Sequence, residues 1–219
     1  NNYIVNAVNL QEGDNYVARV DYNLNSNTRL SGRYLNYRGR DTPGSVFPVP
    51  SADPNSNRND VRSTNFAPAL MYTFSPTLFS ETRASMLWRT EWTPLGDTSG
   101  IAGKLGIPGV DPSGMPRIEV LNYSALGNTP QFRLIGPFRS TQITQSLSWF
   151  KGKHTIKFGG EGRRSSTTDN QLLTRSGRFV FNDVATGRGF ALASLLTGWT
   201  QNAQVITGNV SSRMEYYGI

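Results

Sequence analysis

The sequence predicts an all-β chain, and more specifically part of an antiparallel transmembrane β-barrel. Short polar turns join pairs of strands at 25–27, 75–77 and 151–153. Each following strand enters a long connection rich in Gly, Pro and Asn, over 39–63, 93–139 and 167–211. The strands between them alternate apolar and polar residues. Tight turns on one side and long loops on the other are the layout of outer-membrane barrels, whose tilted strands cross the bilayer.

The expected structure is an open, curved sheet of about 6–8 strands with long loops on one side. This number of strands is too small to close a wide barrel. Residues 1–219 are interpreted as part of a single β-barrel domain. The chain has no initiator Met or signal peptide and stops inside an expected strand at 216–219. We therefore expect an internal fragment whose signal peptide and remaining strands lie elsewhere.

Composition restricts the partners and the chemistry. Hydrophobic residues make up 37% of the chain, and the mean hydropathy is −0.43. These values hide a barrel, because only every second strand residue faces lipid. The chain has no Cys, which excludes disulfides and thiolate chemistry. The net charge is +7, but the cations are dispersed along the chain. We therefore expect no nucleic acid as a partner, whereas the barrel layout predicts outer-membrane lipid.

The segment 78–92 has the clearest alternation. Leu78, Met86 and Trp88 share one face with further apolar and small residues. The opposite face carries four charges, Glu81, Arg83, Arg89 and Glu91. Charges on one side of a strand are natural in a water-filled lumen. The alternative is the solvent-exposed face of a soluble sheet.

Weaker patterns in other segments extend this lumen-facing set. The expected strands are 15–24, 28–38, 64–74, 140–150 and 154–166. Pro68 predicts a bulge or weak pairing in the third expected strand, 64–74, because proline donates no ladder hydrogen bond. The candidates for the lumen are Arg19, Asp21, Glu81, Arg83, Arg89, Glu91, Lys157, Glu161 and Arg163.

Aromatic residues gather near the expected strand ends, which is typical of the girdles at membrane interfaces. Ordinary strand propensity is the alternative explanation. The residues concerned are Tyr16, Tyr34, Tyr72, Trp88, Trp92, Trp149, Tyr216 and Tyr217.

The last part of the chain carries four motifs in a recognisable order. They are WFKGKHTIKFGGEGRR at 149–164, GRFVF at 177–181, FALASLLTG at 190–198 and RMEYYGI at 213–219. This order resembles that of the motifs in the barrel of TonB-dependent outer-membrane receptors, particularly the Oar-like group. The motif GIPG at 106–109 adds to the resemblance.

The resemblance implies a plugged barrel of about 22 strands. It also implies energy-coupled uptake of an unidentified ligand, with TonB as a partner through a plug region outside this chain. The alternative function is a soluble all-β binding module or adhesin. The face that carries the charges of 78–92 discriminates between the two.

The residues suggest no catalytic constellation, so we expect that the protein is not an enzyme. A glycan-cleaving site needs a pair of carboxylates in a cleft, but the strand carboxylates have Arg or Lys nearby on the same face. The chain has one histidine, His154, and we expect neither a metal nor a cofactor. A loose cation site of Asp53, Asn55, Asn57 and Asp60 remains an alternative.

The long connections are the expected ligand-binding surface, because loops of this length usually act as lids or binding surfaces. The alternative is that they only pack over the barrel mouth. A short helix is expected over 190–196. The candidates for ligand contact are Arg40, Phe47, Arg58, Arg117, Tyr123 and Phe132.

Overall fold

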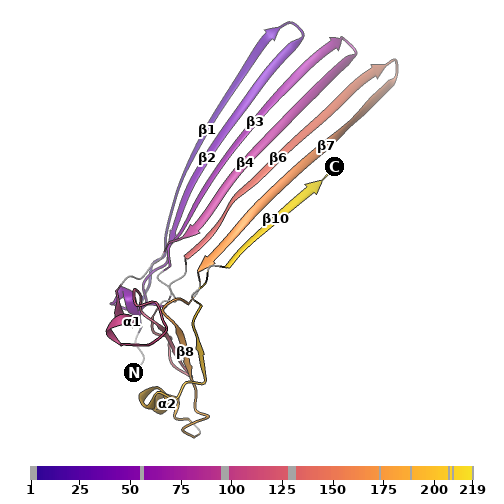
Figure 1. Cartoon of the computed structure of the whole chain (residues 1–219). Coiled ribbons are helices and arrows are strands. Elements are labelled where there is room, and N and C mark those ends of the chain that lie inside the picture. The colour runs from indigo at the N-terminus through magenta and orange to yellow at the C-terminus, as the bar shows by residue number, and fades with distance from the viewer. Residues whose placement is uncertain are drawn as a thin grey trace.

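The computed structural model describes residues 4–54, 57–94, 99–127, 132–172, 174–187, 189–206, 208 and 210–218. These residues form one large antiparallel sheet with the order β1-β2-β3-β4-β6-β7-β10 (Figure 1). Its strands are β1 (Leu10–Asn25), β2 (Thr28–Thr42), β3 (Asn59–Ser75), β4 (Leu78–Thr93), β6 (Phe132–Lys151), β7 (His154–Leu172) and β10 (Val210–Gly218). β1 and β10 are its two edges. The predicted all-β, partial and open architecture is confirmed.

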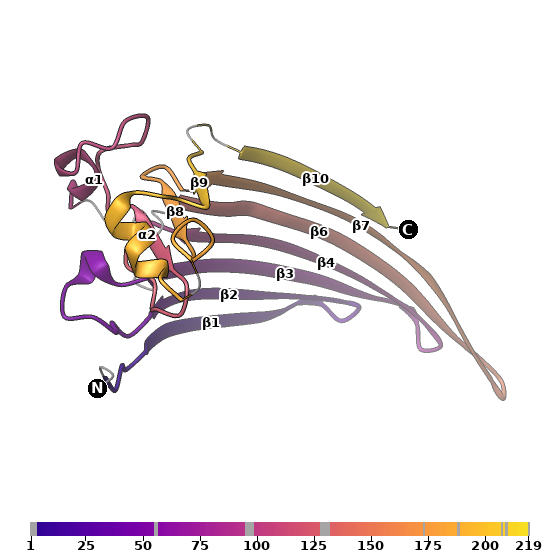
Figure 2. The same ribbon diagram turned by 90° about the horizontal axis from the view of Figure 1, so that it is seen from below.

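The two ends of the sheet differ, as the sequence predicted. At one end, two-residue turns at 26–27, 76–77 and 152–153 close the hairpins. At the other end, the long connections form a small second unit, which we call the cap (Figures 1 and 2). The cap contains α1 (Ile101–Lys104), β5 (Arg117–Val120), β8 (Arg178–Phe181), α2 (Ala191–Thr197) and β9 (Asn202–Gln204). A 3-10 turn, η1 (Pro50–Ala52), lies in the first connection. The helix expected over 190–196 is present as α2.

Several strands are longer than the alternation predicted, so the connections are shorter than expected. They run over 43–58, 94–131 and 173–209. β6 begins at Phe132, whereas the pattern became recognisable only near residue 140. The reason is a shift of register between Ile135 and Arg139, around Pro137, which interrupts the period of two. The corresponding segment therefore reads as a loop in the sequence.

Pro68 weakens pairing on one side of β3 without a bulge. It lies opposite Gly32 in β2, where the register is regular. On the other side, the pairing with β4 passes from Phe66 directly to Ala69 and keeps its register. The missing proline N–H explains the gap.

Neighbouring hairpins are staggered along the sheet. Thr28, the first residue of β2, lies opposite Tyr72, although β3 continues to Ser75. Leu78, the first residue of β4, lies opposite Trp149, although β6 continues to Lys151. The stagger runs in the same direction both times, which is the shear that a tilted barrel wall requires.

Among the described residues, buried apolar side chains are concentrated in the cap. Val120, Phe181 and Ala191 form a small core there. No second layer covers the large sheet in the part of the chain that the structure describes, and Val20 is 69% exposed and Phe158 59% exposed on it. Among the described helices, none has the length and apolar character needed to cross a membrane.

Candidate functional site

The register of the sheet places all of the predicted lumen-facing residues on one face. Residues opposite each other in an antiparallel pair share a face. Arg19 lies opposite Arg33, while Arg83 lies opposite Thr144, which in turn lies opposite Glu161. We call this the charged face. It carries Arg19, Asp21, Glu81, Arg83, Arg89, Glu91, Lys157, Glu161 and Arg163.

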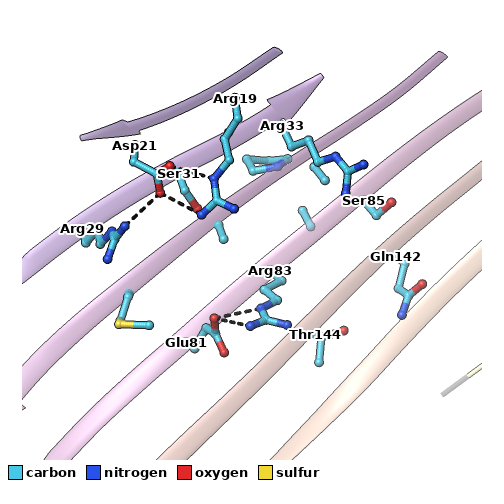
Figure 3. A pocket seen from close by; sticks show the side chains of 16 residues that line it. Arg19, Asp21, Arg29, Ser31, Arg33, Glu81, Arg83, Ser85, Gln142 and Thr144 are labelled. Atoms are coloured by element: carbon cyan, nitrogen blue, oxygen red, sulfur yellow. Dashed lines mark hydrogen bonds and ion pairs between the residues drawn. The ribbon is translucent and has the colours of Figure 1, made fainter. Parts of the chain in front are cut away.

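Four ion pairs on the charged face join residues two apart on the same strand. The side chain of Arg19 donates to Asp21 over 2.7 Å, and Arg83 lies 2.7 Å from Glu81. Figure 3 shows both pairs, with Arg29 also directed at Asp21. Two further pairs are Arg89–Glu91 at 3.1 Å and Arg163–Glu161 at 3.6 Å. Exposed pairs of this kind contribute little to stability, so their main effect is to keep this face charged and hydrated.

A shallow hollow of about 670 Å³ lies over the charged face and is lined from five neighbouring strands, β1, β2, β3, β4 and β6 (Figure 3). Arg33, Gln142 and Thr144 add hydrogen-bonding groups that the sequence analysis did not select. A second hollow of about 450 Å³ continues toward Lys157 and Glu161 on β7. Together they form a broad hollowed surface lined by charged and hydrogen-bonding side chains as well as apolar atoms.

The opposite side of the sheet, the apolar face, carries the aromatic and aliphatic residues of the alternating patterns. A hollow of about 440 Å³ on it is lined by residues that include Val20, Tyr22, Leu30, Phe66 and Leu70. The residues expected in aromatic girdles lie on this face, with one exception. Tyr216 lies opposite Ser165, on the charged face. Tyr216 and Tyr217 are adjacent in β10, and successive strand residues point to opposite sides.

The second and third long connections join in the cap. β5 and β8 pair in parallel, with Arg117 opposite Arg178. Glu119 accepts hydrogen bonds from Arg178 at 2.7 and 3.0 Å and from Arg117 at 2.6 Å. The Arg178 hydrogen bonds are the largest cause that lowers the pKa of Glu119, from 4.5 to about 2, although partial burial opposes the shift.

The first connection is tied to the same unit. The N–H of Gly127 donates to the carbonyl of Ala52 over 2.9 Å, and Arg117 donates to the carbonyl of Pro54 over 3.4 Å. Asp111 pairs with Arg175 at 2.7 Å, which adds a further link between the second and third connections. All three long connections therefore form one connected structure at the end of the sheet.

The cap was not predicted from the sequence, which carries only a weak local signal for its strands. Residues 117–120 (RIEV) alternate polar and apolar residues, and residues 178–181 (RFVF) are one arginine followed by three apolar residues of high strand propensity. Four residues are too few to distinguish a strand from a loop by periodicity. The pairing partner lies about 60 residues away, which a local pattern cannot show.

The predicted ligand-contact residues have different environments. Arg40 lies inside β2, not in a loop, and donates to Asp60 over 3.1 Å. Arg58 pairs with the same carboxylate at 2.8 Å, and Arg117 is held by Glu119. Tyr123 is 60% exposed in the cap, while Phe47 is half-buried. Phe132 begins β6, and its side chain lies outside the described part of the structure.

The alternative cation site is not assembled by the residues that can be placed. Asn55 lies outside the described residues. Asp53 is fully buried and accepts hydrogen bonds from the Ser45 hydroxyl and the Val46 N–H, each at 2.6 Å. Asp60 is paired with two arginines. Among the described residues, no group of three or more His, Cys, Asp or Glu side chains could hold a metal.

The whole chain, residues 1–219, matches the profile of a family described as an outer membrane beta barrel domain. The chain belongs to this family. No curated protein and no solved structure matches it. The family places the protein in the bacterial outer membrane, with outer-membrane lipid around the barrel. A soluble binding module, the alternative that the sequence left open, is therefore wrong.

Proposed function

We propose that this chain forms part of the barrel wall of a TonB-dependent receptor similar to the Oar-like group. In this proposal the receptor takes up a ligand through the outer membrane with energy supplied through TonB. The observation that carries the proposal is the order of the four motifs over 149–219. TonB would act through a plug region outside this chain.

The four motifs fall on both parts of the structure. Residues 149–164 form the tip of the β6–β7 hairpin, and residues 213–218 lie in β10. Residues 177–181 include β8, and residues 190–198 include α2. The resemblance to these receptors therefore extends over the wall and the cap together.

The charged face supports uptake of a polar ligand. In an outer-membrane barrel the lipid-facing side is apolar and the interior is polar. The apolar face would then contact lipid, and the charged face, with its two adjoining hollows, would line the lumen. The carboxylates Glu81, Glu91 and Glu161 each lie beside an arginine, so the proposal gives them no catalytic role.

The cap supplies the surface that a ligand would meet first. Because Arg40, Arg58 and Arg117 already have carboxylate partners, they shape the loops and are poorly suited to bind a ligand. Tyr123 presents an exposed ring, which suits contact with a ligand. It is therefore the first position to substitute in a binding experiment.

The test uses cells that produce the intact protein and are given a defined mixture of peptides, oligosaccharides and ferric chelates. We expect at least one compound to be depleted only by producing cells, and depletion to stop when TonB is removed or the proton gradient is dissipated. Crosslinking in the same cells should join the protein to TonB. Depletion that persists without TonB would show a passive pore, and failure to crosslink would also contradict the proposal.

A further inference from the structure

The apolar face changes character at the end nearest the cap. Along β3, the apolar-face residues run from Phe74 to Phe66, and then polar side chains follow at Thr64 and Arg62. β2 changes in the same way, from Leu30 and Tyr34 to polar residues that include Arg38. In a membrane barrel this change marks the level of the lipid headgroups on the side of the long loops.

Two arginines lie directly opposite each other at this level. Arg38 in β2 and Arg62 in β3 are register partners, and both are exposed. Like charges in this position repel each other and destabilise a sheet. The Arg62 guanidinium lies 4.9 Å from the centre of the Trp92 ring. Farther along the same face, Arg139 lies opposite Trp88.

The acidic groups nearby leave these cations without an ion pair. One row closer to the cap, Asp60 is only 6% exposed and already pairs with Arg40 and Arg58, and Glu12 lies 3.9 Å from Arg40. Asp14 lies opposite Arg38. Within the described part of the chain, no ion pair is formed by Arg38, Arg62 or Arg139.

We propose that Arg38 and Arg62, with the Trp92 ring beside them, bind a phosphate group of an anionic lipid in the outer leaflet. A phosphate between two guanidinium groups would neutralise their repulsion and accept paired hydrogen bonds from each. Arginines near a membrane surface attract anionic headgroups in this way. The acyl chains of the same molecule would lie along Tyr34 and Phe66, and a free phosphate ion would gain nothing from that apolar surface.

The test measures binding of diphosphoryl lipid A to the intact, delipidated protein in detergent by native mass spectrometry. The variant R38Q/R62Q removes the two cations. R19Q/R33Q is the matched control, because Arg19 and Arg33 are also register partners but lie on the charged face. We expect binding to weaken about tenfold or more in R38Q/R62Q, since several charge-assisted hydrogen bonds are lost, and to stay unchanged in the control.

Further measurements distinguish binding of the lipid from binding of a free anion. A conservative variant tests whether a loss of binding comes from misfolding. Excess inorganic phosphate should not displace the lipid, and dephosphorylated lipid A should bind the wild-type protein weakly. R38K/R62K keeps the charge but loses the paired hydrogen bonds, so its affinity should be intermediate. Equal binding by R38Q/R62Q and the control, displacement by inorganic phosphate, or equal binding of the dephosphorylated lipid to wild type would each overturn the proposal.

Discussion

At the scale of single residues, Glu119 connects two chain segments that are far apart in sequence. Its carboxylate accepts hydrogen bonds from Arg117 in its own strand, β5, and from Arg178 in the neighbouring strand of the cap, β8. Replacement by glutamine, E119Q, removes the negative charge and leaves two half-buried cations without it. We expect the local stability of the cap to fall by about 1–3 kcal/mol. Hydrogen-exchange protection of β5 and β8 measures this loss.

A matched control for E119Q is E161Q on the charged face. Glu161 has an exposed side chain and a single arginine partner at 3.6 Å. Its substitution should change stability by less than about 0.5 kcal/mol. If the two variants lost protection equally, the Glu119 ion pairs would not be what holds the cap together.

The lowered pKa of Glu119 predicts how the stability of the cap changes in acid. The folded-state pKa of Glu119, about 2, lies below its ordinary value of 4.5. Its stabilising contribution is therefore complete above about pH 4.5 and is lost as the pH falls toward 2. Exchange protection of β5 and β8, corrected for intrinsic rates, should decrease over this window in the wild type. A similar decrease in E119Q would assign the effect to another group.

Predictions for single residues were right where the geometry of one strand decides on which face of the sheet a side chain lies. Alternation within a strand correctly put Arg19, Glu81 and Glu161 on one face, because backbone geometry fixes the side of each residue. For Arg40 and Arg117, the expected contact with ligand stays a prediction. Asp60, the carboxylate partner of Arg40, lies in the neighbouring strand, a pairing that a local sequence pattern does not show, whereas Glu119 lies two residues from Arg117 in the same strand.

At the scale of elements, the β6–β7 hairpin depends on one close backbone approach. A Cβ added at Gly159 would lie 2.1 Å from the carbonyl oxygen of Gln145, whereas Gly160 and Gly162 have nothing within 4 Å. G159A should therefore destabilise the barrel by about 1–3 kcal/mol through backbone displacement. G160A should be neutral or slightly stabilising, because it only restricts the unfolded chain.

Denaturant unfolding of the intact protein in lipid vesicles compares the two glycine variants. The expected order of stability is G160A equal to or above wild type, and G159A below both. If G159A were as stable as G160A, the backbones of β6 and β7 would not approach each other closely at Gly159.

The strands illustrate why element bounds were harder to predict than element existence. The hairpins joined by short turns were recognised because alternation continues to the turn on both sides. The cap ends of β3 and β6 were missed because Asp60, Arg62 and Pro137 interrupt the apolar pattern there. In the proposed wall this interruption has a physical cause, since the strands continue beyond the lipid into water.

At the scale of the whole molecule, the asymmetry between the two ends of the sheet is the central feature. Short turns at one end and long connections at the other were both predicted from the sequence. The internal structure of the cap was not, because its β5–β8 pair forms between two different connections. The family assignment and the apolar face agree that the sheet crosses a membrane between these ends.

The most direct test of membrane topology measures whether single cysteines can be labelled in intact cells. The test suits this chain because it has no Cys of its own. Cysteine would replace Ser26 and Lys153 in the short turns, and Leu105 and Val184 in the cap, all of which are exposed. A membrane-impermeant thiol reagent should label positions 105 and 184 but not 26 and 153 until the outer membrane is permeabilised. Equal labelling of all four positions in intact cells, or labelling of the turns alone, would contradict a wall that crosses the outer membrane with its cap outside.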